Sequence, residues 1–213
     1  MQHSLYRPID AKRRSIRRSR MSIVSYRDFD ISSFALKYAE NVGKNGSKVI
    51  SAASPYMIQT PCCRLPFDPF SNSFTINLDE SFYHLVRSIE EFVLAEANRR
   101  STEWFGRELG SEMIKSMFKS LITESDKGYL PSMKVPYNEE CEFYESDNTT
   151  IVPRDKLVKG SQVRLLLSFP KVNIKKRCGV TTFNICIELY QLKFAKREAP
   201  AELCPQTFSF IDD

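Results

Sequence analysis

The chain has 213 residues, 42% of them hydrophobic and 12% aromatic, and a formal net charge of +5. This length suits one sizeable domain with short extensions, and no apolar stretch reaches the roughly 18 residues that a membrane-spanning helix needs. We therefore expect a soluble protein that does not bind membranes. The N-terminus lacks the apolar run of a secretory signal, which favours an intracellular location.

Positive charge gathers in the first twenty residues, which contain seven of the 31 Lys and Arg residues against one acid, Asp10. So polar a segment buries too little apolar surface to offset the entropy cost of ordering. We therefore expect residues 1–20 to form a disordered arm that attracts phosphates without sequence specificity. A nuclear-localisation signal or a solubilising segment is the alternative. The candidate phosphate contacts in the arm are Lys12, Arg13, Arg14, Arg17, Arg18 and Arg20.

The next part of the chain changes from extended segments to helices. Residues 48–78 contain short apolar runs broken by prolines, a pattern typical of edge strands and bends. From Asp79 to Val93 the apolar residues fall at helical spacing, and Asp79 can cap the first turn. A second amphipathic stretch begins near Ser111 and includes Ile114, Met117, Phe118 and Leu121. The sequence therefore predicts a helical insertion over about 80–122.

The C-terminal half returns to strands. Apolar and polar residues alternate in QVRLLLSF (162–169) and again in VTTFNICIELYQLKF (180–194). The basic stretch between them, PKVNIKKRCG (170–179), is interpreted as a loop. This order predicts a β-hairpin with a Lys/Arg-rich tip, within a β-rich domain that spans residues 21–197.

Basic residues also gather at this hairpin, since residues 154–177 hold eight Lys and Arg residues against Asp155. Cations that attract phosphates, beside rings that stack on bases, are typical of β-scaffolds that track a single nucleic-acid strand. Candidate phosphate contacts are Lys159, Arg164, Lys171, Lys175, Lys176 and Arg177. Candidate stacking residues, in decreasing order, are Tyr190, Phe169 and Phe183. Core packing is the alternative for the rings, and a solvated hairpin tip is the alternative for the cations.

Motifs for catalysis and cofactors are missing from the sequence. His3 lies in the arm and His84 on the predicted helix, and no glycine-rich nucleotide loop occurs. The six cysteines lack metal-ligand spacing, so we expect reduced, partly buried thiols and consider a redox role only for Cys62 and Cys63. We predict no enzyme activity, no cofactor and no metal. The minor alternative is an enzyme that binds a divalent ion through Glu139, Glu140 and Glu142.

Several sequence blocks follow one another in a characteristic order. They are IQTPCCRLPF (58–67), INLD (76–79), EWFG (103–106), YLPSMKVP (129–136), KGSQVRLLL (159–167) and CGVTTFNICI (178–187). Over roughly residues 48–194, their order and spacing resemble those of the single-stranded DNA-binding proteins of nucleocytoplasmic large DNA viruses. These proteins are considered relatives of the phage OB-fold single-strand binders. The resemblance implies a mainly β (α+β) fold, an OB-fold-like β-barrel with inserted amphipathic helices.

Two departures from the family pattern concern its stacking surface. After KGSQVRLLL, where the family pattern has an aromatic-rich strand, the chain has FPKVNI. After GVT, where a tryptophan is expected, it has Thr182 and Phe183. Part of the family's stacking surface is therefore lost or moved in this chain.

The resemblance implies a non-catalytic protein that binds single-stranded DNA during viral DNA replication or repair, in the host cytoplasm or at a viral replication site. The segment 198–213, which contains QTFSFIDD, is similar to tails that recruit replication proteins, and a frayed terminus is the alternative. A virion structural or capsid-associated scaffold protein that reuses the β-domain is the alternative function. The sequence leaves open a preference for DNA or RNA, a homo-oligomer, and whether residues 1–20 are retained.

Overall fold

The computed structural model describes residues 22–42, 46–54, 56–124, 129–147 and 149–195. The predicted basic arm and the predicted C-terminal tail lie outside these residues. The α-helices are Glu80–Arg99 (α1), Ser101–Phe105 (α2) and Ser111–Met117 (α3), with 3-10 turns at Ile31–Ser33 (η1) and Arg154–Lys156 (η2). The first nine strands are Ile23–Ser25 (β1), Leu36–Val42 (β2), Ser47–Ala52 (β3), Met57–Gln59 (β4), Cys63–Arg64 (β5), Ser73–Asn77 (β6), Phe118–Lys119 (β7), Ile122–Thr123 (β8) and Ser132–Pro136 (β9). The last five are Glu142–Tyr144 (β10), Gln162–Ser168 (β11), Lys171–Arg177 (β12), Val180–Ile185 (β13) and Glu188–Phe194 (β14).

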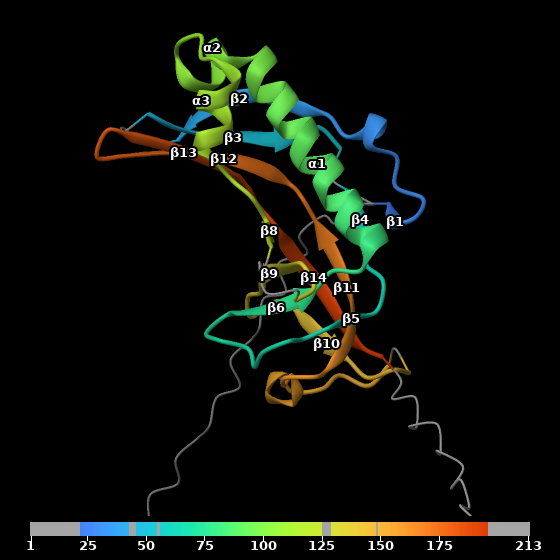
Figure 1. Ribbon diagram of the computed structural model, residues 1–213. Helices are drawn as coiled ribbons and strands as arrows, with labels where there is room; N and C mark the ends of the chain where they lie inside the picture. Colours follow the sequence, from blue (N-terminus) through green and yellow to red (C-terminus); the bar gives the residue numbers. More distant parts are fainter. Residues whose placement is uncertain (1–21, 43–45, 55, 125–128, 148, 196–213) are drawn as a thin grey trace, which may run out of the picture.

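A long, bent β-hairpin made of β11 to β14 runs through the fold (Figure 1). The strand β11 pairs antiparallel with β14, and β12 pairs antiparallel with β13. The chain reverses at Cys178 and Gly179, whose φ angles of 49° and 79° are both left-handed. A two-residue turn with two positive φ angles matches the right-handed twist of the strands that it joins.

The predicted hairpin is therefore present but longer than expected, because the predicted loop over 170–179 is mostly the strand β12. Val172 and Ile174 alternate with Asn173 and are 1% and 2% exposed, so this part of the basic stretch has one buried face. The three consecutive cations after Ile174 mask this alternation in the sequence.

The strands form three sheets, two of which share the bent hairpin. Sheet A has the order β1-β4-β11-β14-β10, with β5 also paired to β11. Sheet B has the order β2-β3-β12-β13-β7, and sheet C the order β6-β9-β8. Because β11 leads into β12 and β13 into β14, the hairpin carries the chain from sheet A into sheet B.

The helices lie beside the two large sheets (Figure 1). As predicted, Asp79 caps α1, since its Oδ1 accepts the backbone N–H of Phe82 at 2.7 Å. The helix α2 was not predicted, and α3 ends at Met117, before the predicted boundary. Phe118 instead begins the strand β7, where it pairs with Phe183 of β13.

One apolar core unites these elements and includes residues from the three sheets and the three α-helices. The ring of Phe183 lies edge-on to Trp104 of α2, with 6.2 Å between centroids, and also contacts Phe118. These aromatic contacts attach the helices to sheet B. The predicted class, mainly β with helices, is confirmed. None of the helices in the described part of the chain combines the length and apolar character needed to cross a bilayer.

A buried carboxylate on α1 holds the segment that leads from the helices back into the strands. Glu90 is 1% exposed and accepts the backbone N–H of Leu121 at 2.6 Å and the hydroxyl of Ser120 at 2.8 Å. Its second oxygen pairs with Arg87 at 3.1 Å. Glu90 therefore fixes the start of β8 against α1.

We predict that Glu90→Ala lowers the free energy of unfolding by about 2–4 kcal/mol, because two partly buried donors lose their acceptor. Urea unfolding followed by circular dichroism would measure the change. The matched control is Glu91→Ala on the exposed side of the same helix, which should change stability by less than about 0.5 kcal/mol. Equal effects of the two substitutions would contradict this role of Glu90.

Candidate nucleic-acid interface

The outer face of sheet A carries polar and charged side chains opposite a fully apolar inner face. Val163, Leu165 and Leu167 of β11 are at most 1% exposed and belong to the core. Successive side chains of a strand point to opposite faces, so the intervening Arg164 and Leu166 lie on the outer face. Arg164 is exposed and Leu166 is half-buried. The same alternation in β14 places Lys193 on this outer face and Leu192 in the core.

Strand pairing brings two cationic side chains and one aromatic side chain into one row across sheet A. Arg164 of β11 lies opposite Lys193 of β14, and Lys193 lies opposite Tyr144 of β10. Adjacent strands are about 4.8 Å apart, so β10, which carries Tyr144, lies about 10 Å from β11, which carries Arg164. Two cations and a ring therefore stand side by side on one exposed surface.

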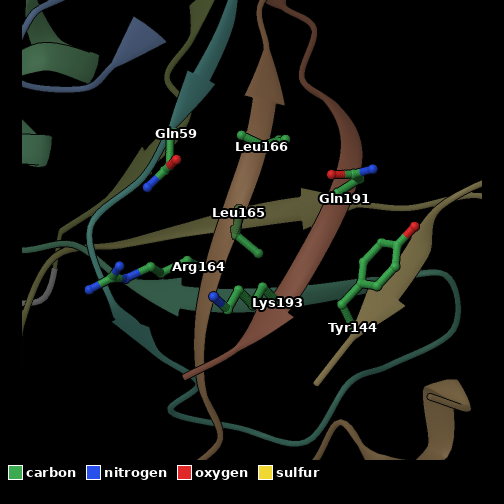
Figure 2. Close-up of a pocket in the computed structure, with 7 residues that line it drawn as sticks. All are labelled: Gln59, Tyr144, Arg164, Leu165, Leu166, Gln191 and Lys193. Atoms are coloured by element: carbon green, nitrogen blue, oxygen red, sulfur yellow. The ribbon is translucent and has the colours of Figure 1, made fainter. Parts of the chain in front are cut away.

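A second row lies one step along the same strands. Leu166 of β11 pairs with Gln59 of β4 on one side and with Gln191 of β14 on the other. Together the two rows line an open pocket of about 420 Å³, and Figure 2 shows their side chains around β11 and β14. The residues that line it are Gln59, Tyr144, Arg164, Leu165, Leu166, Gln191 and Lys193. The pocket thus offers cations, amides and a ring above an apolar floor.

The two cations of the first row have no acidic partner among the described residues. The ion pairs of these residues involve neither Arg164 nor Lys193. Like charges directly opposite one another on neighbouring strands destabilise a sheet by a few tenths of a kcal/mol or more. An anion bound between Arg164 and Lys193 would remove this repulsion and gain charge-assisted hydrogen bonds. The row is therefore suited to a phosphate.

Glu142 of β10 sits beside the pocket and positions two of its side chains. Its Oε2 accepts the hydroxyl of Tyr144 at 2.7 Å and the amide Nε2 of Gln191 at 3.4 Å. These bonds hold the Tyr144 ring and the Gln191 amide in fixed orientations at the edge of the pocket.

Further cations follow the hairpin away from the pocket. Lys175, Lys176 and Arg177 at the end of β12 are all exposed, and no ion pair of the described residues includes them. Lys171, nearer to the bend, pairs with Glu188 at 3.7 Å. The cations of β11 to β14 that form no ion pair with the described residues therefore fall into two groups, one at the pocket and one at the hairpin tip.

The predicted stacking residues differ from the ring that the structure presents. Phe169 is 4% exposed and Phe183 is 1% exposed, so both rings pack in the core and offer no face to a base. Tyr190 is half-buried at a bulge in β14, its hydroxyl lies 3.5 Å from Glu188, and burial raises its pKa. Tyr144 was not predicted. The alternation in CEFYE was the only sequence signal for Tyr144. Its position beside Lys193 depends on the pairing of β10 with β14, two segments that are far apart in the chain.

Of the remaining predicted contacts, Lys159 does not line the pocket, and the arm lies outside the described residues. Lys159 lies in the turn before β11, where its backbone N–H donates to the carboxylate of Asp68. The side chain of Lys159 is exposed. Gln59, Gln191 and Lys193 line the pocket but were not predicted either, since nothing in their local sequence separates them from other surface residues. The arm residues Lys12 to Arg20 lie outside the described residues.

The described cysteines and acidic residues form no metal cluster: no three His, Cys, Asp or Glu side chains gather in the part of the chain that the structure covers. Cys63 and Cys141 are buried, and burial raises the pKa of both thiols, that of Cys63 to about 12. A thiol with so high a pKa carries almost no thiolate at neutral pH, and the thiolate is the reactive form. This is unfavourable for the redox hypothesis at Cys63.

Comparisons with known proteins show only distant similarity. No protein-family model matches the chain, and no curated protein matches it. The solved single-stranded DNA-binding protein of bacteriophage Enc34 is similar with a TM-score of 0.45 and 13% identity, over 80% of this chain and 95% of that one. The same phage protein in complex with single-stranded DNA is similar with a TM-score of 0.45 and 12% identity, over 78% and 98%. Such a likeness is too distant to support a function, which therefore depends on the geometry described above.

We predict that a thiol reagent modifies Cys178, exposed at the hairpin tip, well before Cys63, because Cys63 is buried and burial raises the pKa of its thiol. Timed alkylation of the native protein followed by peptide mass spectrometry would measure both rates. Cys63 should react only after denaturation. Modification of Cys63 as fast as that of Cys178 in the native protein would contradict the burial of Cys63.

Proposed function

We propose that this chain binds single-stranded DNA stoichiometrically, without catalysing a reaction, and does so in viral DNA replication or repair. The observation that carries the proposal is the row of Arg164, Lys193 and Tyr144 on adjacent strands, with two unpaired cations beside an aromatic ring. The sequence resemblance described above supports the viral setting and the replication role.

The row suits an unpaired strand because it can hold a phosphate and a base at the same time. Arg164 and Lys193 would contact the backbone, and Tyr144 would stack on a neighbouring base, an interaction worth about 1–3 kcal/mol that any base can make. In a duplex the base faces are already stacked, so the ring could add nothing. The cations at the end of β12 would contact phosphates further along the same strand.

The proposal extends to two segments outside the described residues. The basic arm over 1–20 would raise the encounter rate with nucleic acid through long-range attraction, which weakens as salt rises. The tail over 198–213 would contact replication proteins. Both follow from the sequence, and the pocket on sheet A would supply the recognition of an unpaired strand.

We predict that Arg164→Ala combined with Lys193→Ala makes the slope of log affinity against log salt less negative by about 0.7, since the pair neutralises one phosphate and each neutralised phosphate contributes about 0.7 for single strands. Tyr144→Ala should instead weaken binding by about 1–3 kcal/mol without changing the slope. Fluorescence anisotropy with a labelled oligonucleotide across a salt series measures both quantities.

Two controls make this experiment specific. Lys115→Ala removes one cation from α3, away from sheet A (Figure 1), where Lys115 pairs with Glu112, and should leave the slope unchanged. Tyr144→Phe keeps the ring and should keep most of the affinity. Salt-independent binding by the unmodified protein, or an unchanged slope in the double variant, would exclude this face as the site. An RNA oligonucleotide of the same sequence would reveal any preference between DNA and RNA.

A virion structural or scaffold role is the second candidate, because large apolar side chains are exposed away from the pocket. Phe67 and Phe70, in the loop between β5 and β6, are 64% and 81% exposed. Large apolar side chains exposed on a surface can mark protein contacts.

We predict that, if this role holds, the protein self-associates at micromolar concentration and Phe67→Ser combined with Phe70→Ser restores the monomer. Light scattering after gel filtration would measure the mass, with Tyr129→Ser, a substitution of another exposed ring, as the control. A monomer at every concentration would remove the support that these residues give to self-assembly.

A further inference from the structure

Hydrogen-bond acceptors that phosphate recognition does not use lie in the pocket, on Gln59 and Gln191, and beside it, on Glu142. A carboxylate beside a phosphate site is unfavourable for the phosphate, yet Glu142 is held at the pocket's edge by Tyr144 and Gln191. Both bonds end on Oε2, so Oε1 accepts no hydrogen bond from the described residues. One strong acceptor therefore remains available for a bound molecule.

The amide of Gln191 adds a second acceptor. Because its nitrogen donates to Glu142, its oxygen must point the other way, and Figure 2 shows that oxygen on the side of Leu166. Gln59 lies on the opposite side of Leu166, and Figure 2 shows its amide oxygen also on the side of Leu166. The apolar Leu166 thus lies between two amide oxygens, one row away from the two cations.

This arrangement suits a flat ring that carries an amino group on its edge. The face of the ring can lie on Leu166, while an amino group donates to the carboxylate of Glu142 or to the amide oxygen of Gln191. Cytosine, adenine and guanine each carry an exocyclic amino group, and carboxylates are established acceptors for that of cytosine. Thymine has none, and it would turn a carbonyl oxygen toward the carboxylate.

Given the function proposed above, on which this inference rests, we propose that Glu142 and Gln191 make the pocket a base-selective subsite, which prefers an amino-bearing base over thymine. The remainder of the interface, through Tyr144 stacking and phosphate contacts, stays tolerant of sequence. The preference is therefore confined to one nucleotide position within a bound strand.

The test compares labelled oligo(dC) with oligo(dT) of equal length at pH 8, where cytosine is neutral, and uses the full chain in fluorescence anisotropy. Both are pyrimidines, so differences in ring size are small. We expect oligo(dC) to bind about tenfold more tightly, as one hydrogen bond to a charged acceptor would produce. Glu142→Gln should reduce this ratio to about one, mainly by strengthening the binding of oligo(dT).

Glu139→Gln is the matched control, because it removes one exposed carboxylate from the same acidic run and should leave the ratio unchanged. Gln191→Met, which keeps the side-chain length and removes the amide oxygen, should lower the ratio while retaining the fold. Melting curves would verify that each variant is folded.

The outcomes separate this inference from the proposed function. Equal binding of oligo(dC) and oligo(dT) by the unmodified protein overturns the base preference and leaves single-strand binding in place. A preference that survives both Glu142→Gln and Gln191→Met overturns the assignment to these residues. Failure of both oligonucleotides to bind at low salt overturns the proposed function itself.

Discussion

The alternation of side chains along the bent hairpin is the constraint on which the rest of the structure depends. The inner face of β11 to β14 is committed to the core, as the full burial of Val163, Leu165 and Ile174 shows. Arg164, Lys171 and Asn173, which alternate with these apolar residues, therefore lie on the opposite face, whereas Ser168 is buried. One packing requirement therefore buries the apolar side chains and displays polar side chains on the other face of both β11 in sheet A and β12 in sheet B.

Arg164 and Lys193 illustrate what such a face can tolerate. Their repulsion costs far less than the core contributes, since each fully buried aliphatic side chain is worth about 1.5–3 kcal/mol. The sheet can therefore carry a locally unfavourable pair that an anionic ligand would stabilise. Glu142 balances this charge only in part, because it is one carboxylate beside two cations, and its Oε2 accepts from the neutral Tyr144 and Gln191. The pocket thus joins attraction for a backbone to acceptors for a base, and this combination distinguishes it from the more uniformly cationic hairpin tip.

Local patterns in the sequence predicted the elements whose signal is local. The α1 helix, its Asp79 cap and the strand β11 follow from spacing and capping chemistry within a few residues. The prediction was wrong for β12, where consecutive cations concealed the alternation, and for the end of α3, where pairing of Phe118 with Phe183 replaces the last helical turn. The prediction was also wrong for Phe169 and Phe183, whose rings are buried, because an aromatic residue in a sequence is equally compatible with a core and with a binding face.

The sequence by itself determined a mainly β chain with one strong amphipathic helix, a basic hairpin, and Arg164 as an outward cation, because each depends on residues close in the chain. The tertiary structure alone decided the candidate site. It aligned Tyr144 with Lys193 through the parallel pairing of β10 and β14, and it placed Gln59 beside Leu166, more than one hundred residues away in the chain. Strand register between distant segments is set by the burial of the whole core, and no local pattern contains that information.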